Sequence, residues 1–166
     1  MVVTARSVLV YVDVQRDFYE AGAPACVDGT TECIPAMSRI AQAFRLAGRP
    51  IVHVVRLYLA DGSNAEPVRR PMLETASIVR PGTSGSQLPE DLLSAYAPPL
   101  DPALLLGGGL QEVGQSEWVM YKPRLGCVLR HLPGGPSPRA RGGRGRRRRL
   151  QLPEVSAHEP GRSERT

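Results

Sequence analysis

Residues 7–18 read SVLVYVDVQRDF, a run of β-forming apolar residues that is followed at once by polar ones. An uninterrupted apolar run of this kind is typical of a strand that is covered on both faces, as in a parallel α/β sheet. In such sheets, ligands bind beyond the carboxyl ends of the strands. Asp13 stands at that end of the run, so it is the first candidate for a chemical role.

A helix and two further strands extend this pattern. Apolar residues recur at helical spacing over residues 34–44, and residues 50–57, PIVHVVRL, predict a second buried strand. Residues 7–57 therefore predict a βαβ unit with a right-handed crossover. Residues 117–122, EWVMYK, predict a third strand that ends in polar residues, the first of them Lys122. The pattern favours an α/β fold with a doubly wound, Rossmann-like parallel sheet.

The stretch between the second and third strands is rich in turn-forming residues. It runs over residues 58–114 and holds one short helical candidate at residues 89–95. Segments of this length without regular structure are usually lids or binding regions. We therefore expect residues 58–114 to shape the site rather than the sheet.

Charge divides the 166-residue chain into two parts. Residues 1–125 hold 11 basic and 13 acidic groups, whereas residues 126–166 hold 10 basic and 3 acidic ones. The first part predicts one domain, and the second, rich in Arg, Gly and Pro, predicts a disordered tail. No early apolar run is long enough for a membrane span or a signal peptide, so we expect a cytoplasmic protein without a membrane partner.

Four motifs in order resemble the isochorismatase-like cysteine hydrolase family. They are VDVQRDF, VVRLYLADGSNAE, PGTSGSQL and EWVMYKPRLG, and the resemblance covers about residues 5–126. It implies a three-layer αβα fold and hydrolysis of a small-molecule amide or related C–N bond by an Asp, a Lys and a Cys. By motif, the Asp is Asp13 and the Lys is Lys122. One branch of the family cleaves a vinyl ether of the isochorismate type without the cysteine, so that reaction stays open.

The resemblance also bears on partners and cofactors. It implies a small-molecule substrate and leaves a homo-oligomer open. Metal-binding relatives carry an Asp/His/His set that this sequence does not show, so neither a metal nor another cofactor is expected. His53, alone within an apolar strand, predicts a packed and hydrogen-bonded histidine. Phe18 and Arg56 are candidates for the substrate pocket, as an aromatic wall and as a cation for a substrate carboxylate.

None of the three cysteines fits the nucleophile position. Cys26 and Cys33 predict ordinary free thiols in a loop and at a helix start. Cys127 follows the third strand, whereas the family resemblance places the nucleophile after a fourth strand, in a pattern such as AG-x-x-T-x-x-C. That pattern does not occur in the sequence as written.

A shift of reading frame accounts for this difference. Codons that encode Gly126 onward can be chosen so that reading one base later gives AAFYGTSLEAHLRA. Residues 150–164 then permit CNFPKCPRTS followed by a segment ending EAS, which restores the family pattern with its second cysteine at the nucleophile position. We therefore hypothesise a frame change near Leu125 or Gly126. With the residues as written, the sheet stops after about three strands and leaves an apolar face uncovered.

The basic block from Arg139 to Arg149, RARGGRGRRRR, supports a competing interpretation. Such a block can neutralise nucleic-acid phosphates without sequence preference. However, no aromatic residue is interleaved within it for base stacking, and charge blocks alone are weak evidence. We favour an accidental basic tail produced by a shifted frame, and a nucleic-acid partner is not expected.

The frame hypothesis makes a direct prediction about the gene. Resequencing of codons 120–130 is expected to reveal one inserted or missing base, and the intact mass of the purified protein is expected to match the restored frame. An unbroken frame, together with a mass that matches the sequence as written, would refute the hypothesis.

Overall fold

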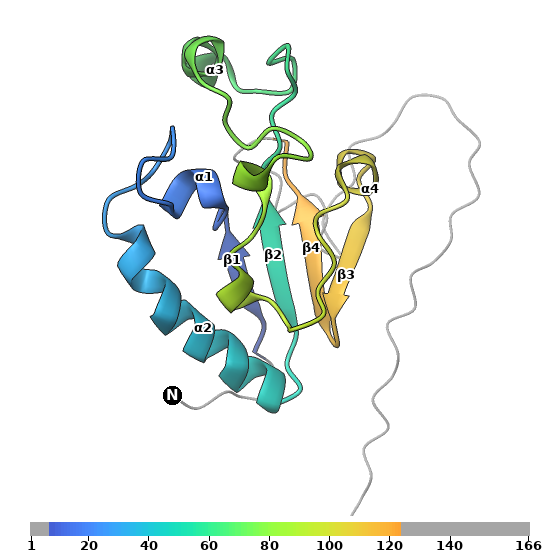
Figure 1. The fold of residues 1–166 in the computed structure, drawn as a ribbon. Helices are drawn as coiled ribbons and strands as arrows, with labels where there is room; N and C mark the ends of the chain where they lie inside the picture. The colour runs from blue at the N-terminus through green and yellow to red at the C-terminus, as the bar shows by residue number, and fades with distance from the viewer. Residues whose placement is uncertain (1–6, 124–166) are drawn as a thin grey trace, which may run out of the picture. The chain divides into compact units, whose positions relative to one another are not determined.

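A four-stranded mixed sheet forms the centre of the fold. The computed structural model describes residues 7–123, and its sheet has the order β1-β2-β4-β3 (Figure 1). The strands are β1 (Leu9–Val12), β2 (Ile51–Val55), β3 (Leu110–Gly114) and β4 (Glu117–Tyr121). β1, β2 and β4 are parallel, and β3 pairs antiparallel with β4. The predicted α/β class with a parallel sheet is confirmed.

Helix α2 (Thr30–Leu46) provides the βαβ crossover that the spacing predicts. It follows the short helix α1 (Arg16–Tyr19), lies against one face of the sheet (Figure 1), and is succeeded by Gly48, whose φ of 60° favours glycine. Its buried side chains pack with those of β1 and β2 in a cluster made of Tyr11, Val14, Ile34, Ala41, Phe44, Ile51 and Leu92. Burial of this apolar stripe is the main source of its stability, because isolated helices of this length are marginal in water.

The stretch between β2 and β4 contains more regular structure than predicted. It includes η1 (Pro67–Arg69), α3 (Arg70–Thr75), η2 (Ser84–Ser86), α4 (Pro102–Leu106) and β3. The helix predicted at residues 89–95 is a single 3-10 turn, η3 (Glu90–Leu92). These elements are three to six residues long, which is too short for a sequence period to reveal them.

A second apolar cluster fixes β3 and α4 to the sheet. Its buried members are Val55, Leu57, Leu88, Leu100, Leu105, Val113 and Val119. In β3, Gln111 and Val113 are buried, whereas Leu110 and Glu112 are exposed. This alternation is that of a strand with one covered face.

The opposite face of β1 differs from the prediction of a strand covered on both faces. Val8, Val10 and Val12 are 53%, 44% and 47% exposed, while Leu9 and Tyr11 face the α2 cluster. Among residues 7–123, α2 covers only one side of this strand. The three valines therefore form an apolar face that the described part of the chain leaves in contact with solvent.

A buried polar network ties α2 to the start of β4. The side chain of Glu117 is 1% exposed and accepts hydrogen bonds from Arg45 Nε and Nη2, both at 2.8 Å. His53 Nε2 lies 2.7 Å from Glu117 Oε1, and the His53 ring stacks on Tyr11 with centroids 5.5 Å apart. His53 is thus packed and hydrogen-bonded, as the sequence predicts.

Hydrogen bonds and the neighbouring Arg45 charge outweigh burial in setting the pKa of Glu117. Burial alone would raise the pKa of this carboxyl group, but the hydrogen bonds from His53 and Arg45 and the charge of Arg45 lower the pKa below its ordinary value. A carboxylate with a lowered pKa stabilises the folded state above the pKa of the unfolded chain. That contribution is lost as the pH falls through the lowered folded value.

Within residues 7–123, no helix is both long and apolar enough to cross a lipid bilayer.

This network predicts an acid-sensitive component of stability. At pH 7, Glu117→Gln is expected to lower the free energy of unfolding by about 3 kcal/mol, because it leaves Arg45 without its buried partner. Urea unfolding between pH 7 and pH 3 is expected to show a smaller loss of stability below pH about 4.5 in this variant than in the parent. The matched control is Glu112→Gln, at an exposed position of β3. Equal acid sensitivity in all three proteins would contradict the assignment.

Candidate active site

Three charged side chains follow three parallel strands at one edge of the sheet. Asp13 comes directly after β1, Arg56 after β2 and Lys122 after β4. The backbone ladder continues to these positions, since Asp13 N donates to Val54 O at 2.9 Å and Lys122 N donates to Val55 O at 3.0 Å. Because parallel strands end at the same edge, their pairing brings these residues together.

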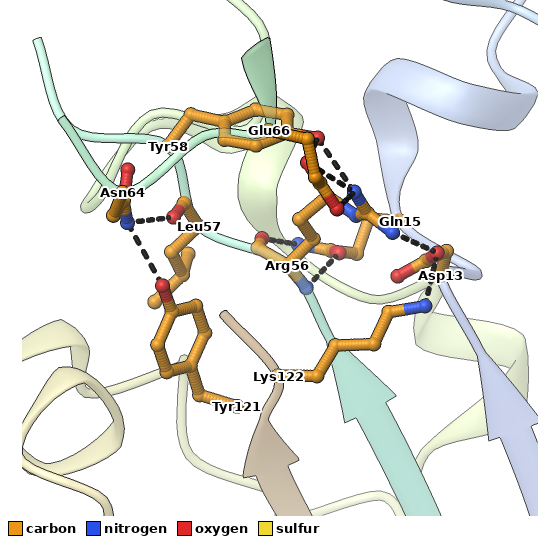
Figure 2. Close-up of polar contacts among 9 residues, drawn as sticks. All are labelled: Asp13, Gln15, Arg56, Leu57, Tyr58, Asn64, Glu66, Tyr121 and Lys122. Carbon is orange, nitrogen blue, oxygen red and sulfur yellow. Dashed lines mark hydrogen bonds and ion pairs between the residues drawn. The ribbon is translucent and has the colours of Figure 1, made fainter. Parts of the chain in front are cut away.

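Asp13 and Lys122 form a direct ion pair at this edge. Lys122 Nζ lies 2.6 Å from Asp13 Oδ2, and Arg56 Nη2 lies 3.3 Å from the same oxygen (Figure 2). The side chain of Lys122 is 4% exposed, and that of Asp13 is 28% exposed. The other carboxylate oxygen, Asp13 Oδ1, is shielded from solvent and has no hydrogen-bond partner in the described part of the chain. In this pair, Lys122 binds Asp13 Oδ2, and Asp13 Oδ1 is free to accept a proton.

The backbone at Asp13 has an unusual conformation. Its φ is 57°, in the left-handed region, where Asp is tolerated better than most residues other than glycine. Such a residue costs on the order of 1–3 kcal/mol and persists when its surroundings fix it. Here the Asp13 N–H binds Val54 O, and Asp13 O accepts from Gln15 N at 3.0 Å. This turn directs the chain from β1 into α1.

Arg56 is enclosed by acceptors. Its Nη1 donates to Tyr58 Oη at 2.7 Å and to Glu66 Oε1 at 3.0 Å, and its side chain is 4% exposed. Burial would lower the pKa of Arg56, but the hydrogen bond to Tyr58 and the charges of Asp13 and Glu66 raise the pKa above its ordinary value. Binding of a substrate carboxylate by Arg56 stays a prediction. In the structure its Nη1 and Nη2 groups are engaged by the protein itself.

Phe18 lies on α1, within a third apolar cluster. It is partly buried and packs against the cluster made of Tyr58, Ala65, Leu73, Ile78 and Val79. Phe18 thus packs against the same cluster as the loop residue Tyr58, which contacts Arg56. Its role as an aromatic wall for a substrate stays a prediction.

Gln15 is a functional residue that sequence reasoning left without a role. It is fully buried, and its side-chain amide accepts from Arg56 N at 2.8 Å and donates to Arg56 O at 2.9 Å and Ser86 O at 2.7 Å. It therefore links the end of β1 to the end of β2 (Figure 2), and its bond to Ser86 O adds a link to η2. Its place two residues after Asp13, on a buried strand end, is the signal that could have revealed it.

Asp17 on α1 binds the chain just before the PGTSGSQL segment, residues 81–88, and lies close to that segment at Gly85. Its Oδ2 accepts from Val79 N at 2.5 Å, and a Cβ atom added at Gly85 would lie 2.1 Å from Asp17 Oδ1. Only glycine allows this approach of the loop to the carboxylate. Glu66 is the other contributor that the sequence does not mark, because it lies in a loop without any periodic pattern.

Of the cysteines in the described part of the chain, neither Cys26 nor Cys33 forms a hydrogen bond with Asp13 or Lys122. Cys33 is exposed on α2, and Cys26 is partly exposed between α1 and α2. Cys127 and the basic block lie outside the described residues. Over residues 7–123, no group of three or more His, Cys, Asp or Glu side chains is arranged to hold a metal ion.

Two surface cavities lie apart from the ion pair. Their volumes are about 440 and 470 Å³, and Arg16 and Glu90 contribute to both. Neither cavity is lined by Asp13 or Lys122. The site is therefore defined by its side-chain geometry and not by either of these two cavities.

Comparison with solved structures identifies the fold. The chain is similar to an isochorismatase family protein from Desulfovibrio vulgaris subsp. vulgaris str. Hildenborough, with 29% identity and a TM-score of 0.56 over 74% of this chain and 55% of that one. It also matches a nicotinamidase/pyrazinamidase from Bacillus subtilis, with 20% identity and a TM-score of 0.49 over 69% and 55% of the two chains. No protein-family model and no curated protein matches the sequence.

The fold and the ion pair together define an α/β protein with a carboxylate–ammonium site at the carboxyl edge of a parallel sheet. The resemblance to the isochorismatase-like cysteine hydrolase family is confirmed by the Desulfovibrio structure. The chain spans about half the length of that structure, 55%.

The buried amide of Gln15 predicts a measurable loss of stability on its removal. Gln15→Leu leaves Arg56 N–H and Ser86 O without partners in the protein interior. Each buried unsatisfied group costs roughly 1–3 kcal/mol, so we expect a loss of about 2–4 kcal/mol in urea unfolding. The matched control is Gln42→Leu, at an exposed position of α2, which is expected to change stability by less than about 0.5 kcal/mol. Similar losses in both variants would show that the amide links are unimportant.

Proposed function

We propose that this fold serves a hydrolase of small-molecule amides or related C–N bonds, with Asp13 as general base and Lys122 as the group that holds it. The single observation that carries the proposal is the 2.6 Å contact between Lys122 Nζ and Asp13 Oδ2, combined with the unpartnered Asp13 Oδ1. One oxygen is fixed by a cation while the other remains available for a proton. A general base needs such a free oxygen within hydrogen-bond reach of the proton that it removes.

The proposed reaction uses a cysteine thiol as nucleophile. A thiol with an ordinary pKa of about 8.5 is mostly protonated at neutral pH, so a nearby carboxylate must accept its proton. Asp13 Oδ1 takes that proton, sulfur forms a bond to the carbonyl carbon, and the C–N bond breaks as the nitrogen takes the proton from Asp13. Water then attacks the thioester and gives one proton to Asp13. The C–S bond breaks, the leaving sulfur takes this proton back from Asp13, and the thiol, the ionised Asp13 and a carboxylic acid result.

The nucleophile is proposed to come from the restored reading frame. Neither Cys26 nor Cys33 has a hydrogen bond to Asp13 in the described residues, and the family pattern with its second cysteine arises only when residues 126–166 are read one base later. The chain as written is therefore proposed to lack thiol-dependent turnover. A cytoplasmic location, a small-molecule substrate and self-association are proposed along with this activity.

The proposal is tested with the restored-frame protein on a panel of small carboxamides, by release of ammonia. Asp13→Asn and Lys122→Met are each expected to lower kcat/KM by about 10²–10⁴, since both remove a group of the acid–base step. The exposed carboxylate of Asp28 provides the matched control, and Asp28→Asn is expected to retain full activity.

Two outcomes would contradict the proposal. Turnover that survives both Asp13→Asn and Lys122→Met would show that the ion pair is not catalytic. Hydrolysis of an isochorismate-type vinyl ether by the chain as written, unaffected by a thiol-alkylating reagent, would favour the branch of the family that uses no cysteine.

A further inference from the structure

A second carboxylate, Glu66, shares the Arg56 guanidinium with Asp13. Arg56 Nη1 lies 3.0 and 3.2 Å from the two carboxylate oxygens of Glu66, whereas Arg56 Nη2 lies 3.3 Å from Asp13 Oδ2. Tyr58 Oη accepts from Arg56 Nη1 at 2.7 Å and donates to Glu66 Oε2 at 3.3 Å. Figure 2 shows the guanidinium between the two acidic side chains. The shorter contacts of Arg56 are with Glu66 and Tyr58, so Glu66 is its main ionic partner.

The four charged groups balance one another. Asp13 and Glu66 supply two negative charges, and Arg56 and Lys122 supply two positive ones. Their side chains are 28%, 12%, 4% and 4% exposed in that order, so solvent screens this set only weakly. Removal of any one charge would therefore be felt by the other three.

An unbalanced second cation would make Asp13 a poor base. An opposite charge within about 4–6 Å lowers the pKa of a carboxyl group by roughly 1–3 units. A general base works best when its pKa is near the working pH, so the influence of Arg56 on Asp13 must be limited.

Glu66 is placed to limit the influence of Arg56 on the basicity of Asp13. Burial tends to raise the pKa of Glu66, but its own backbone N–H and the Arg56 charge lower the pKa below its ordinary value, which keeps Glu66 ionised at neutral pH.

We propose that Glu66 is a positioning residue that sets the basicity of Asp13 by holding and neutralising Arg56. This inference rests on the proposed role of Asp13 as a base. The charged groups that face Asp13 are Lys122 from the end of β4 and Arg56 from the end of β2, and Glu66 acts on it through Arg56. Arg56 thus serves the site as a bridge between two carboxylates.

The test is a titration of the Asp13 side-chain carboxyl carbon by NMR in the full chain as written. The signal is assigned through its loss in Asp13→Asn. Glu66→Gln is expected to lower the titration midpoint of Asp13 by about 1 unit relative to the parent, because Arg56 then has only Asp13 as an ionic partner. Glu66→Asp keeps the charge and is expected to return most of the shift. Glu90→Gln is the matched control, since Glu90 pairs with Arg16 and its side chain is 89% exposed.

A double variant keeps the test decisive if Glu66→Gln alone does not fold. Arg56→Gln/Glu66→Gln removes one charge of each sign and leaves none unpaired. If Glu66 acts on Asp13 through Arg56, its loss has no further effect once Arg56 is replaced, so the double variant and Arg56→Gln alone are expected to share one Asp13 midpoint above that of the parent. An unchanged midpoint in folded Glu66→Gln, or a midpoint in the double variant clearly below that of Arg56→Gln, would overturn the inference. The proposed function has its own test in this experiment. If Lys122→Met left the Asp13 midpoint unchanged, the proposed function of the Asp13–Lys122 pair would fail.

Discussion

The parallel pairing of β1 and β4 on either side of β2 is the constraint on which the site depends. Asp13 and Lys122 are 109 residues apart in the sequence, and their side chains meet because β2 pairs with both strands in register. The ladder extends one residue beyond the strands, to the N–H groups of Asp13 and Lys122. Main-chain hydrogen bonds therefore fix the backbone positions of both Asp13 and Lys122, independently of their side chains. A shift of one residue in either register would turn the charged side chain to the other face.

The sequence predicted the strands that are rich in apolar residues and the helix with a long apolar stripe. β1, β2 and β4 are only four or five residues long, but their apolar content marks them, α2 repeats its apolar residues over 17 residues, and the strand ends then indicate Asp13 and Lys122. β3, whose sequence is LQEVG, mixes polar and apolar residues, and α4 is a five-residue helix among turn-forming residues, so neither shows such a pattern. Glu66 is a different case. It is brought to Arg56 by a loop, and the path of a loop follows from tertiary packing rather than from local sequence.

The position of β1 explains why the chemistry is incomplete in the described residues. β1 is an edge strand of the described sheet, and Val8, Val10 and Val12 on its outer face are exposed. Asp13 therefore lies at the border of this sheet, with Lys122 and Arg56 on one side of its carboxylate. In the proposed reaction, the nucleophile that gives its proton to Oδ1 comes from residues other than Cys26 and Cys33. The proposed reaction and the hypothesis of a changed reading frame therefore depend on each other.

The two ends of β4 show how a structural polar cluster differs from a chemical one. At its start, both oxygens of Glu117 are bound, Oε2 by Arg45 and Oε1 by Arg45 and His53, so neither is left without a partner. Beyond its end, Lys122 binds only one oxygen of Asp13 and leaves the other shielded but unpaired. An unpaired buried acceptor costs free energy, and it persists where the surrounding contacts fix the residue that carries it. The strained φ at Asp13 and the ladder bond to Val54 show that fixation, and the unused oxygen is the one to which the proposed function assigns proton transfer.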